Sequence, residues 1–94
     1  MRSAADSLKR VSLELGGKSP NIVFDDADFE SAVASASFGC FLNSGQFCMA
    51  GTRVFVQESI YDRFVEAQIK AAENIKMGDP FEEGVTHGPV ISVS

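Results

Sequence analysis

Hydrophobic and polar residues alternate near the start of the chain in a way that predicts a β-strand. Val11, Leu13 and Leu15 are apolar, whereas the residues between them are polar. A period of two places the apolar side chains on one face of a strand, and two consecutive glycines end it. A second strand is predicted at residues 21–24, a short apolar run between a proline and two aspartates.

A helical period replaces this alternation from residue 28 onwards. Apolar residues recur at intervals of 4, 3 and 4, the stripe of an amphipathic helix: Phe29, Val33, Ala36 and Cys40. We expect this helix to run to Leu42 or Asn43. Three acidic residues stand at its start, where a helix favours negative charge: Asp25, Asp26 and Asp28. Cys40 lies on the apolar stripe and is therefore interpreted as a packing residue.

A third strand and a second helix follow. Residues 52–57 are rich in β-branched and aromatic side chains, which predicts a strand. The next helix is expected to begin at Ser59, whose spacing from Asp62 resembles a capping box, and to end at the Gly-Asp-Pro turn of residues 78–80. Its apolar stripe is predicted at Ile60, Phe64, Ala67, Ala71 and Ile75.

The order β-β-α-β-α predicts an α/β fold. The two strands that flank the first helix are expected to pair in parallel, because the connection between parallel strands is usually a helix. Parallel sheets need cover on both faces, and these elements are too few to cover one. We therefore interpret the chain as a piece of a larger fold.

Composition excludes several classes of function. The 94 residues include 8 Lys and Arg against 13 Asp and Glu, a formal net charge of −5, so no nucleic-acid surface is expected. No apolar stretch approaches the roughly 20 residues that span a bilayer, so no membrane association is expected. Two Cys and one His cannot fill a four-ligand zinc site, and no metal is expected. Free thiols without a secretory signal indicate the cytoplasm, with the mitochondrion as an alternative.

Cys48 and Glu14 are the two candidate catalytic side chains. Cys48 lies where the first predicted helix passes into a strand, with a glycine three residues to either side that would permit close approach of another backbone. It is either a thiolate nucleophile or a small buried hydrophobic residue. Glu14 is either a solvent-facing residue of its strand or a base at a sheet edge. His87, in a polar turn, is interpreted as a solvated loop residue.

Two motifs resemble the active-site signatures of one enzyme family. ELGGKSP at residues 14–20 and GQFC at residues 45–48 are similar to the glutamate and cysteine signatures of the NAD(P)-dependent aldehyde dehydrogenase superfamily. They occur in the family's order, and Glu14 and Cys48 are 34 residues apart (48 minus 14), which fits its pattern. The likeness extends through further segments to residue 92 and covers nearly the whole chain from about Ala4.

The resemblance implies a role for each candidate. Cys48 is the expected nucleophile, which forms a thiohemiacetal and then a thioester with an aldehyde, and its backbone N–H is an expected oxyanion donor. Glu14 is the expected general base. Four neighbours complete the implied site: Leu15 and Gly16 near the nicotinamide of NAD or NADP, Phe47 and Met49 in the substrate pocket.

The resemblance also implies the setting of the site. Residues 1–94 would be the N-terminal part of an incomplete, Rossmann-like catalytic domain of the aldehyde dehydrogenase fold. The dinucleotide-binding domain is expected to lie outside these residues, and no G-x-G-x-x-G motif occurs here. The complete protein is expected to be a homodimer or homotetramer that oxidises a small-molecule aldehyde to a carboxylic acid, and the isolated piece is expected to be inactive. The alternative is a non-catalytic remnant, or a binding or subunit piece without the cofactor domain.

Overall fold

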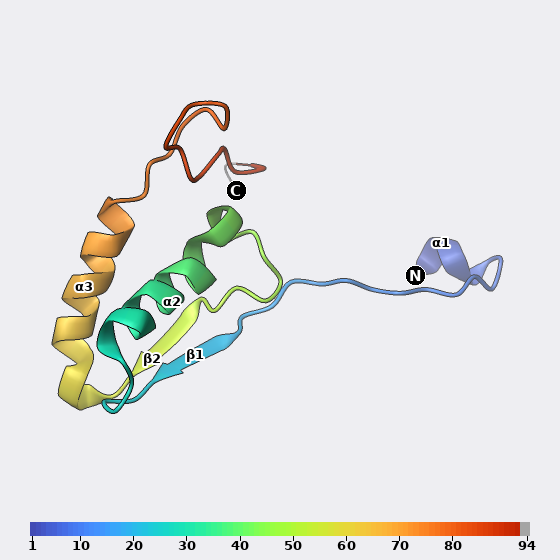
Figure 1. Ribbon diagram of the computed structural model, residues 1–94. Helices are drawn as coiled ribbons and strands as arrows, with labels where there is room; N and C mark the ends of the chain where they lie inside the picture. Colours follow the sequence, from blue (N-terminus) through green and yellow to red (C-terminus); the bar gives the residue numbers. More distant parts are fainter. Residues whose placement is uncertain (93–94) are drawn as a thin grey trace.

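The computed structural model describes residues 1–92, and its packed part is a two-stranded parallel sheet with two long helices (Figure 1). These elements are β1 (Pro20–Val23), α2 (Phe29–Phe41), β2 (Arg53–Val56) and α3 (Tyr61–Glu73). The register of the two strands runs from Pro20 opposite Arg53 to Val23 opposite Val56. The predicted α/β class and the predicted parallel pair around the first helix are therefore confirmed.

Helix α2 begins where the acidic residues predicted it. Asp28 is its N-cap, and the Asp28 carboxylate accepts a 2.8 Å hydrogen bond from the backbone N–H of Ser31. Hydrogen bonds from the side chain of Ser31 and then from its backbone lower the pKa of Asp28, because they favour the charged carboxylate. The helix ends at Phe41, one residue before the expected range.

The core lies between the two helices and one face of the sheet. Phe64 of α3 is 1% exposed and packs with Val23, Val33 and Ala36. Its ring meets that of Phe29 edge to face, with 6.0 Å between the centroids. The predicted stripes are confirmed at Phe29, Val33 and Ala36 of α2 and at Phe64, Ala67 and Ala71 of α3. Cys40 is not among the residues that form or contact this core, and Ile60, which does pack against it, lies before α3. Helix α3 ends at Glu73, before the predicted stop, and Ile75 lies beyond it.

The opposite face of the sheet is exposed. Ile22 and Phe55, which pair across the two strands, are 60% and 55% exposed, and Phe24 just after β1 is 61% exposed. Within residues 1–92 both long helices therefore lie on one side of the strands (Figure 1).

The capping box predicted between Ser59 and Asp62 is wrong. Ser59 lies in a short 3₁₀ turn, η2 (Glu58–Ile60), and its hydroxyl donates to Oδ2 of Asp25 at 3.0 Å. Gln57 binds the same residue twice: its Nε2 donates to Asp25 Oδ2 at 2.8 Å and its Oε1 accepts from the Asp25 N–H at 3.1 Å. Asp25 therefore links the C-terminal ends of β1 and β2, and it does not cap a helix.

The strand predicted at residues 11–15 is also wrong. Residues 9–19 have no regular structure and extend away from the packed part to a short helix, α1 (Arg2–Ala5), which was not predicted (Figure 1). Val11, Leu13 and Leu15 are 47%, 54% and 71% exposed. A strand needs a neighbour for its backbone hydrogen bonds, and within the described residues the sheet contains only β1 and β2.

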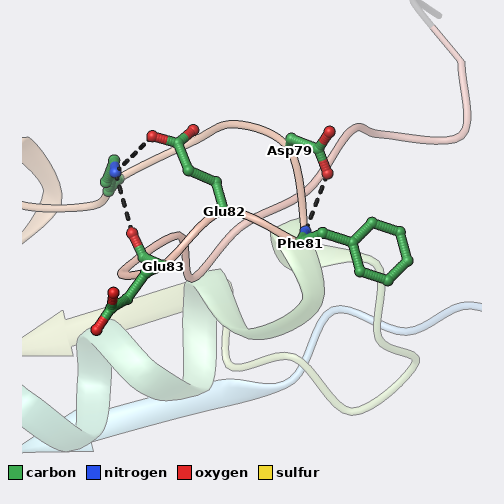
Figure 2. A network of polar contacts seen from close by, with 5 residues as sticks. Asp79, Phe81, Glu82 and Glu83 are labelled. Atoms are coloured by element: carbon green, nitrogen blue, oxygen red, sulfur yellow. Dashed lines mark hydrogen bonds and ion pairs between the residues drawn. The ribbon is translucent and has the colours of Figure 1, made fainter.

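A loop closed by polar contacts follows α3 (Figure 2). The Lys76 ammonium lies 3.0 Å from Oε1 of Glu82 and donates to the Glu83 carbonyl at 3.2 Å. The Phe81 N–H donates to Oδ1 of Asp79 at 2.9 Å. The chain then returns at residues 86–91 toward the C-terminal end of α2 (Figure 1).

Candidate active site

Cys48 lies in the connection between α2 and β2. The chain leaves the helix through a 3₁₀ turn, η1 (Leu42–Gly45), in which three consecutive residues have positive φ angles: Asn43 at 53°, Ser44 at 57° and Gly45 at 72°. Glycine adopts this left-handed conformation freely, whereas a serine there costs on the order of 1 kcal/mol. The Ala50 N–H then donates to the Phe47 carbonyl at 3.2 Å, which closes a turn that leaves Cys48 exposed.

The extended segment of residues 14–18 lies beside this turn and forms a cleft with it. The cleft has a volume of about 440 Å³. Its two sides are Glu14, Leu15, Gly16, Gly17 and Lys18 on one and Gly45, Gln46, Phe47 and Cys48 on the other. The structure thus brings five of the six candidate site residues to one cavity. Met49, 71% exposed, is not among the lining residues.

The two sides approach each other closely at Gly17. A Cβ atom at this position would overlap the carbonyl oxygen of Cys48, so a larger residue would push the segment and the turn apart. The close approach was expected instead at Gly45 and Gly51, where an added Cβ would meet ordinary contacts at 3.4 Å. Glycine is therefore required on the side of the cleft that faces the cysteine.

Two charged side chains line the cleft. Glu14 contributes a carboxylate and Lys18 an ammonium group, which donates to the Gly17 carbonyl at 3.1 Å. Within residues 1–92 the backbone N–H of Cys48 has no acceptor, so it is available to a ligand. No group of three His, Cys, Asp or Glu residues in the described part of the chain is arranged to hold a metal ion.

Cys40 and His87 have different surroundings from Cys48. Cys40 is half-buried and lines an apolar hollow together with Ala36 and Phe64, but it is not among the residues packed against the core, so its packing role stays a prediction. The interpretation of His87 as a solvated loop residue is wrong. Its ring is half-buried, with Nε2 2.8 Å from the Phe41 carbonyl oxygen and Nδ1 2.8 Å from the Thr86 hydroxyl. No sequence pattern indicates such a contact, because its acceptor is a backbone atom far away along the chain.

Three residues of the cleft were not singled out from the sequence: Gly17, Lys18 and Gln46. The Gln46 side chain accepts from the Ile91 N–H at 2.9 Å and donates to the Asn43 carbonyl at 3.3 Å. All three lie inside the two motifs, and their proximity to Glu14 and Cys48 in the sequence was the available signal.

The geometry can be compared with known proteins. The sequence model of the aldehyde dehydrogenase family matches residues 1–94. A putative aldehyde dehydrogenase-like protein of Schizosaccharomyces pombe is 55% identical over 93 residues, which are 98% of this chain and 18% of that protein. The structure of betaine aldehyde dehydrogenase from Staphylococcus aureus in complex with NAD+ matches 98% of this chain and 18% of its own, with a TM-score of 0.89 and 49% identity. An NADP-dependent enzyme of Escherichia coli matches 96% and 19%, with a TM-score of 0.85 and 47% identity.

The chain therefore spans about a fifth of the length of these relatives, and the match covers nearly all of its own residues. The chain belongs to the aldehyde dehydrogenase family.

Proposed function

We propose that residues 1–94 are the N-terminal part of the catalytic domain of an NAD(P)-dependent aldehyde dehydrogenase, within a longer chain that also holds the dinucleotide-binding domain. The observation that carries this proposal is the shared cleft: an exposed thiol, Cys48, and a carboxylate, Glu14, line one cavity from opposite sides. Family membership and the likeness to a betaine aldehyde dehydrogenase bound to NAD+ support it.

Cys48 acts as the nucleophile in this proposal. Its thiol loses a proton to solvent water, and the sulfur adds to the aldehyde carbonyl carbon to form the oxyanion of a thiohemiacetal. The carbonyl oxygen then carries negative charge, and the N–H of Cys48, which has no acceptor within residues 1–92, would donate a hydrogen bond to it. Loss of hydride from the same carbon, with its electron pair, leaves a thioester on Cys48.

Glu14 acts as the general base that releases the product. Its carboxylate takes a proton from a water molecule, whose oxygen adds to the thioester carbonyl. The carbon–sulfur bond then breaks, the electron pair returns to sulfur, and a carboxylic acid leaves. Because Glu14 is on the segment opposite the cysteine, water can enter between the two groups.

The residues present fit the nicotinamide end of a dinucleotide. Leu15 offers a 71% exposed apolar side chain, and the space beside Gly16 is open, so that a flat ring could lie against both. Bound NAD+ or NADP+ supplies the hydride acceptor at this place. Leu15 and Gly16 would hold the ring against the cleft and keep bulk water from the reacting carbon.

The remaining assignments follow from the same proposal. Phe47 lines the cleft and would contact the side chain of a small-molecule aldehyde, whereas the pocket role of Met49 stays a prediction. We propose that the complete protein is a homodimer or homotetramer in the cytoplasm, with the mitochondrion as the alternative. Among residues 1–92 no helix has the length and apolar character needed to cross a bilayer.

The test uses the full-length chain and the substitutions Cys48→Ala and Cys40→Ala. Cys48→Ala should reduce aldehyde-dependent NAD(P)H formation by about 10⁴-fold or more, as removal of a nucleophile does. Cys40→Ala is the matched control and should retain activity, because Cys40 lies in a separate hollow. Iodoacetamide should inactivate the enzyme through Cys48, the more exposed thiol.

Activity that survives Cys48→Ala would contradict the nucleophile assignment. A full-length protein that binds NAD(P)+ but oxidises no aldehyde would contradict the proposed activity.

A further inference from the structure

We infer that residues 86–91 are a brace that fixes the turn leading to Cys48, and that His87 is its principal positioning residue. The catalytic consequence of this brace rests on the proposed function. The brace itself is a structural claim, and it can be tested without any enzymatic activity.

The turn between α2 and Cys48 needs support from outside. Asn43, Ser44 and Gly45 all have positive φ angles, and only the last is a glycine. Side chains with a Cβ adopt this conformation when the surrounding structure holds them there. Three local hydrogen bonds join Asn43 and Gln46: the backbone N–H and Nε2 of Gln46 donate to the Asn43 carbonyl at 3.1 and 3.3 Å, and Nδ2 of Asn43 donates to the Gln46 carbonyl at 3.3 Å.

Three contacts from the returning segment reach this turn. The His87 ring binds the carbonyl of Phe41, the last residue of α2, at 2.8 Å. The Ser44 hydroxyl donates to the Gly88 carbonyl at 3.3 Å. The Gln46 side chain accepts from the Ile91 N–H at 2.9 Å. These contacts fall at the beginning, the middle and the end of the turn. The last of them, at Gln46, lies two residues before Cys48.

The protonation of His87 follows from its two partners. A carbonyl oxygen only accepts hydrogen bonds, so Nε2 must carry the proton that binds Phe41. In the neutral ring Nδ1 is then an acceptor, and the Thr86 hydroxyl can donate to it. The Phe41 carbonyl therefore sets the tautomer, and the Thr86 hydroxyl helps to hold the ring in the orientation that reaches the end of α2.

The brace is itself anchored to the chain that follows α3. The Gly78 N–H donates to the His87 carbonyl at 3.1 Å, and the Thr86 N–H donates to the Lys76 carbonyl at 3.1 Å. Between these points the Lys76 ammonium contacts Oε1 of Glu82 and the carbonyl oxygen of Glu83. The Glu83 side chain points away from these two contacts (Figure 2). Residues 86–91 do not line the cleft, so they act on Cys48 only through the turn.

The experiment compares His87→Phe with His87→Gln in the full-length chain. Phenylalanine keeps the ring shape without a donor, whereas glutamine keeps an N–H near the position of Nε2. In hydrogen-exchange mass spectrometry without substrate or cofactor, His87→Phe should speed exchange at residues 42–50 by about two- to tenfold, the range for one net hydrogen bond. Exchange in the middle of α2 should not change. Under the proposed function kcat should fall about 10- to 100-fold with little change in KM, because a misplaced nucleophile weakens the reaction step.

His87→Gln should restore both measurements to near the wild-type values. Glu83→Gln is the control within the same loop and should alter neither, since the Glu83 carboxylate makes no contact there. If His87→Phe does not fold, Thr86→Val removes the hydroxyl that holds the ring and should give a smaller change in the same direction. Wild-type exchange at residues 42–50 in both His87→Phe and Thr86→Val, or equal impairment by phenylalanine and glutamine, would overturn the brace. A wild-type protein without aldehyde oxidation would overturn the proposed function, while faster local exchange in His87→Phe would still support the brace.

Discussion

The two sides of the cleft belong to regions of opposite character. Residues 20–75 contain the buried cluster around Phe64 and both paired strands. Residues 8–15 are exposed throughout and make no regular structure. Cys48 belongs to the first region and Glu14 to the second. The position of the thiol therefore follows from packing within the described residues, whereas the carboxylate lies on an irregular segment that approaches the Cys48 backbone at Gly17.

The largest expected effect tests the packed region. Phe64→Ala in the full-length chain should lower the free energy of unfolding by about 3–5 kcal/mol, because it removes a 1% exposed ring from the core. Leu13→Ala should cost less, about 1 kcal/mol, because 54% of Leu13 is already exposed. Urea unfolding of both variants gives the comparison. An equal cost for the two would show that the first segment is packed as tightly as the core in the complete protein.

A smaller effect tests the contact between the two regions. Gly17→Ala should lower kcat about 10- to 100-fold, because the new methyl group displaces the segment of Glu14 from Cys48. It should also change the rate of Cys48 alkylation in the absence of cofactor. Gly16→Ala, where the space is open, should leave that alkylation rate as in the wild type. If both variants alkylate alike, the close approach does not set the geometry of the cleft.

The smallest effect concerns the start of α2. Because the pKa of Asp28 is lowered in the folded state, the charged carboxylate stabilises the fold fully above its ordinary pKa of 3.8. This contribution is lost as the pH falls through the lowered pKa. Asp28→Asn keeps a capping oxygen and loses the charge, so its deficit relative to the wild type should be present at about pH 7 and shrink toward about pH 3. Urea unfolding at both pH values measures it, and a deficit that grows on acidification would contradict the assignment.

The sequence pattern predicted those elements whose packing partners lie within the described chain. The stripe through Val33 and Ala36 and the one through Phe64 meet each other, so a period of 3.6 was sufficient to place them. The alternation at residues 11–15 has the period of a strand. A strand also needs a neighbour, and none is present beside it among residues 1–92.

The candidate site was predictable in its residues and less so in its geometry. The motifs placed Glu14 and Cys48 together, and both line the cleft. The contacts of Gly17 and His87 could not be predicted, because their partners are the carbonyl oxygens of Cys48 and Phe41. Backbone atoms are the same in every residue, so side-chain patterns do not encode which of them will be approached.

The parallel pairing of β1 with β2 has a consequence for biosynthesis. Pro20 pairs with Arg53, so β1 leaves the ribosome a few seconds before its partner, at roughly 5–20 residues per second. Helix α2 can form during that interval, since helices form within about a microsecond. Until β2 has been synthesised, both edges of β1 lack a pairing partner, and Ile22 and Phe24 are exposed. Nascent strands in this state are prone to aggregate. A chaperone that binds extended apolar segments would therefore be expected to act first at β1, before the turn that carries Cys48 has been made.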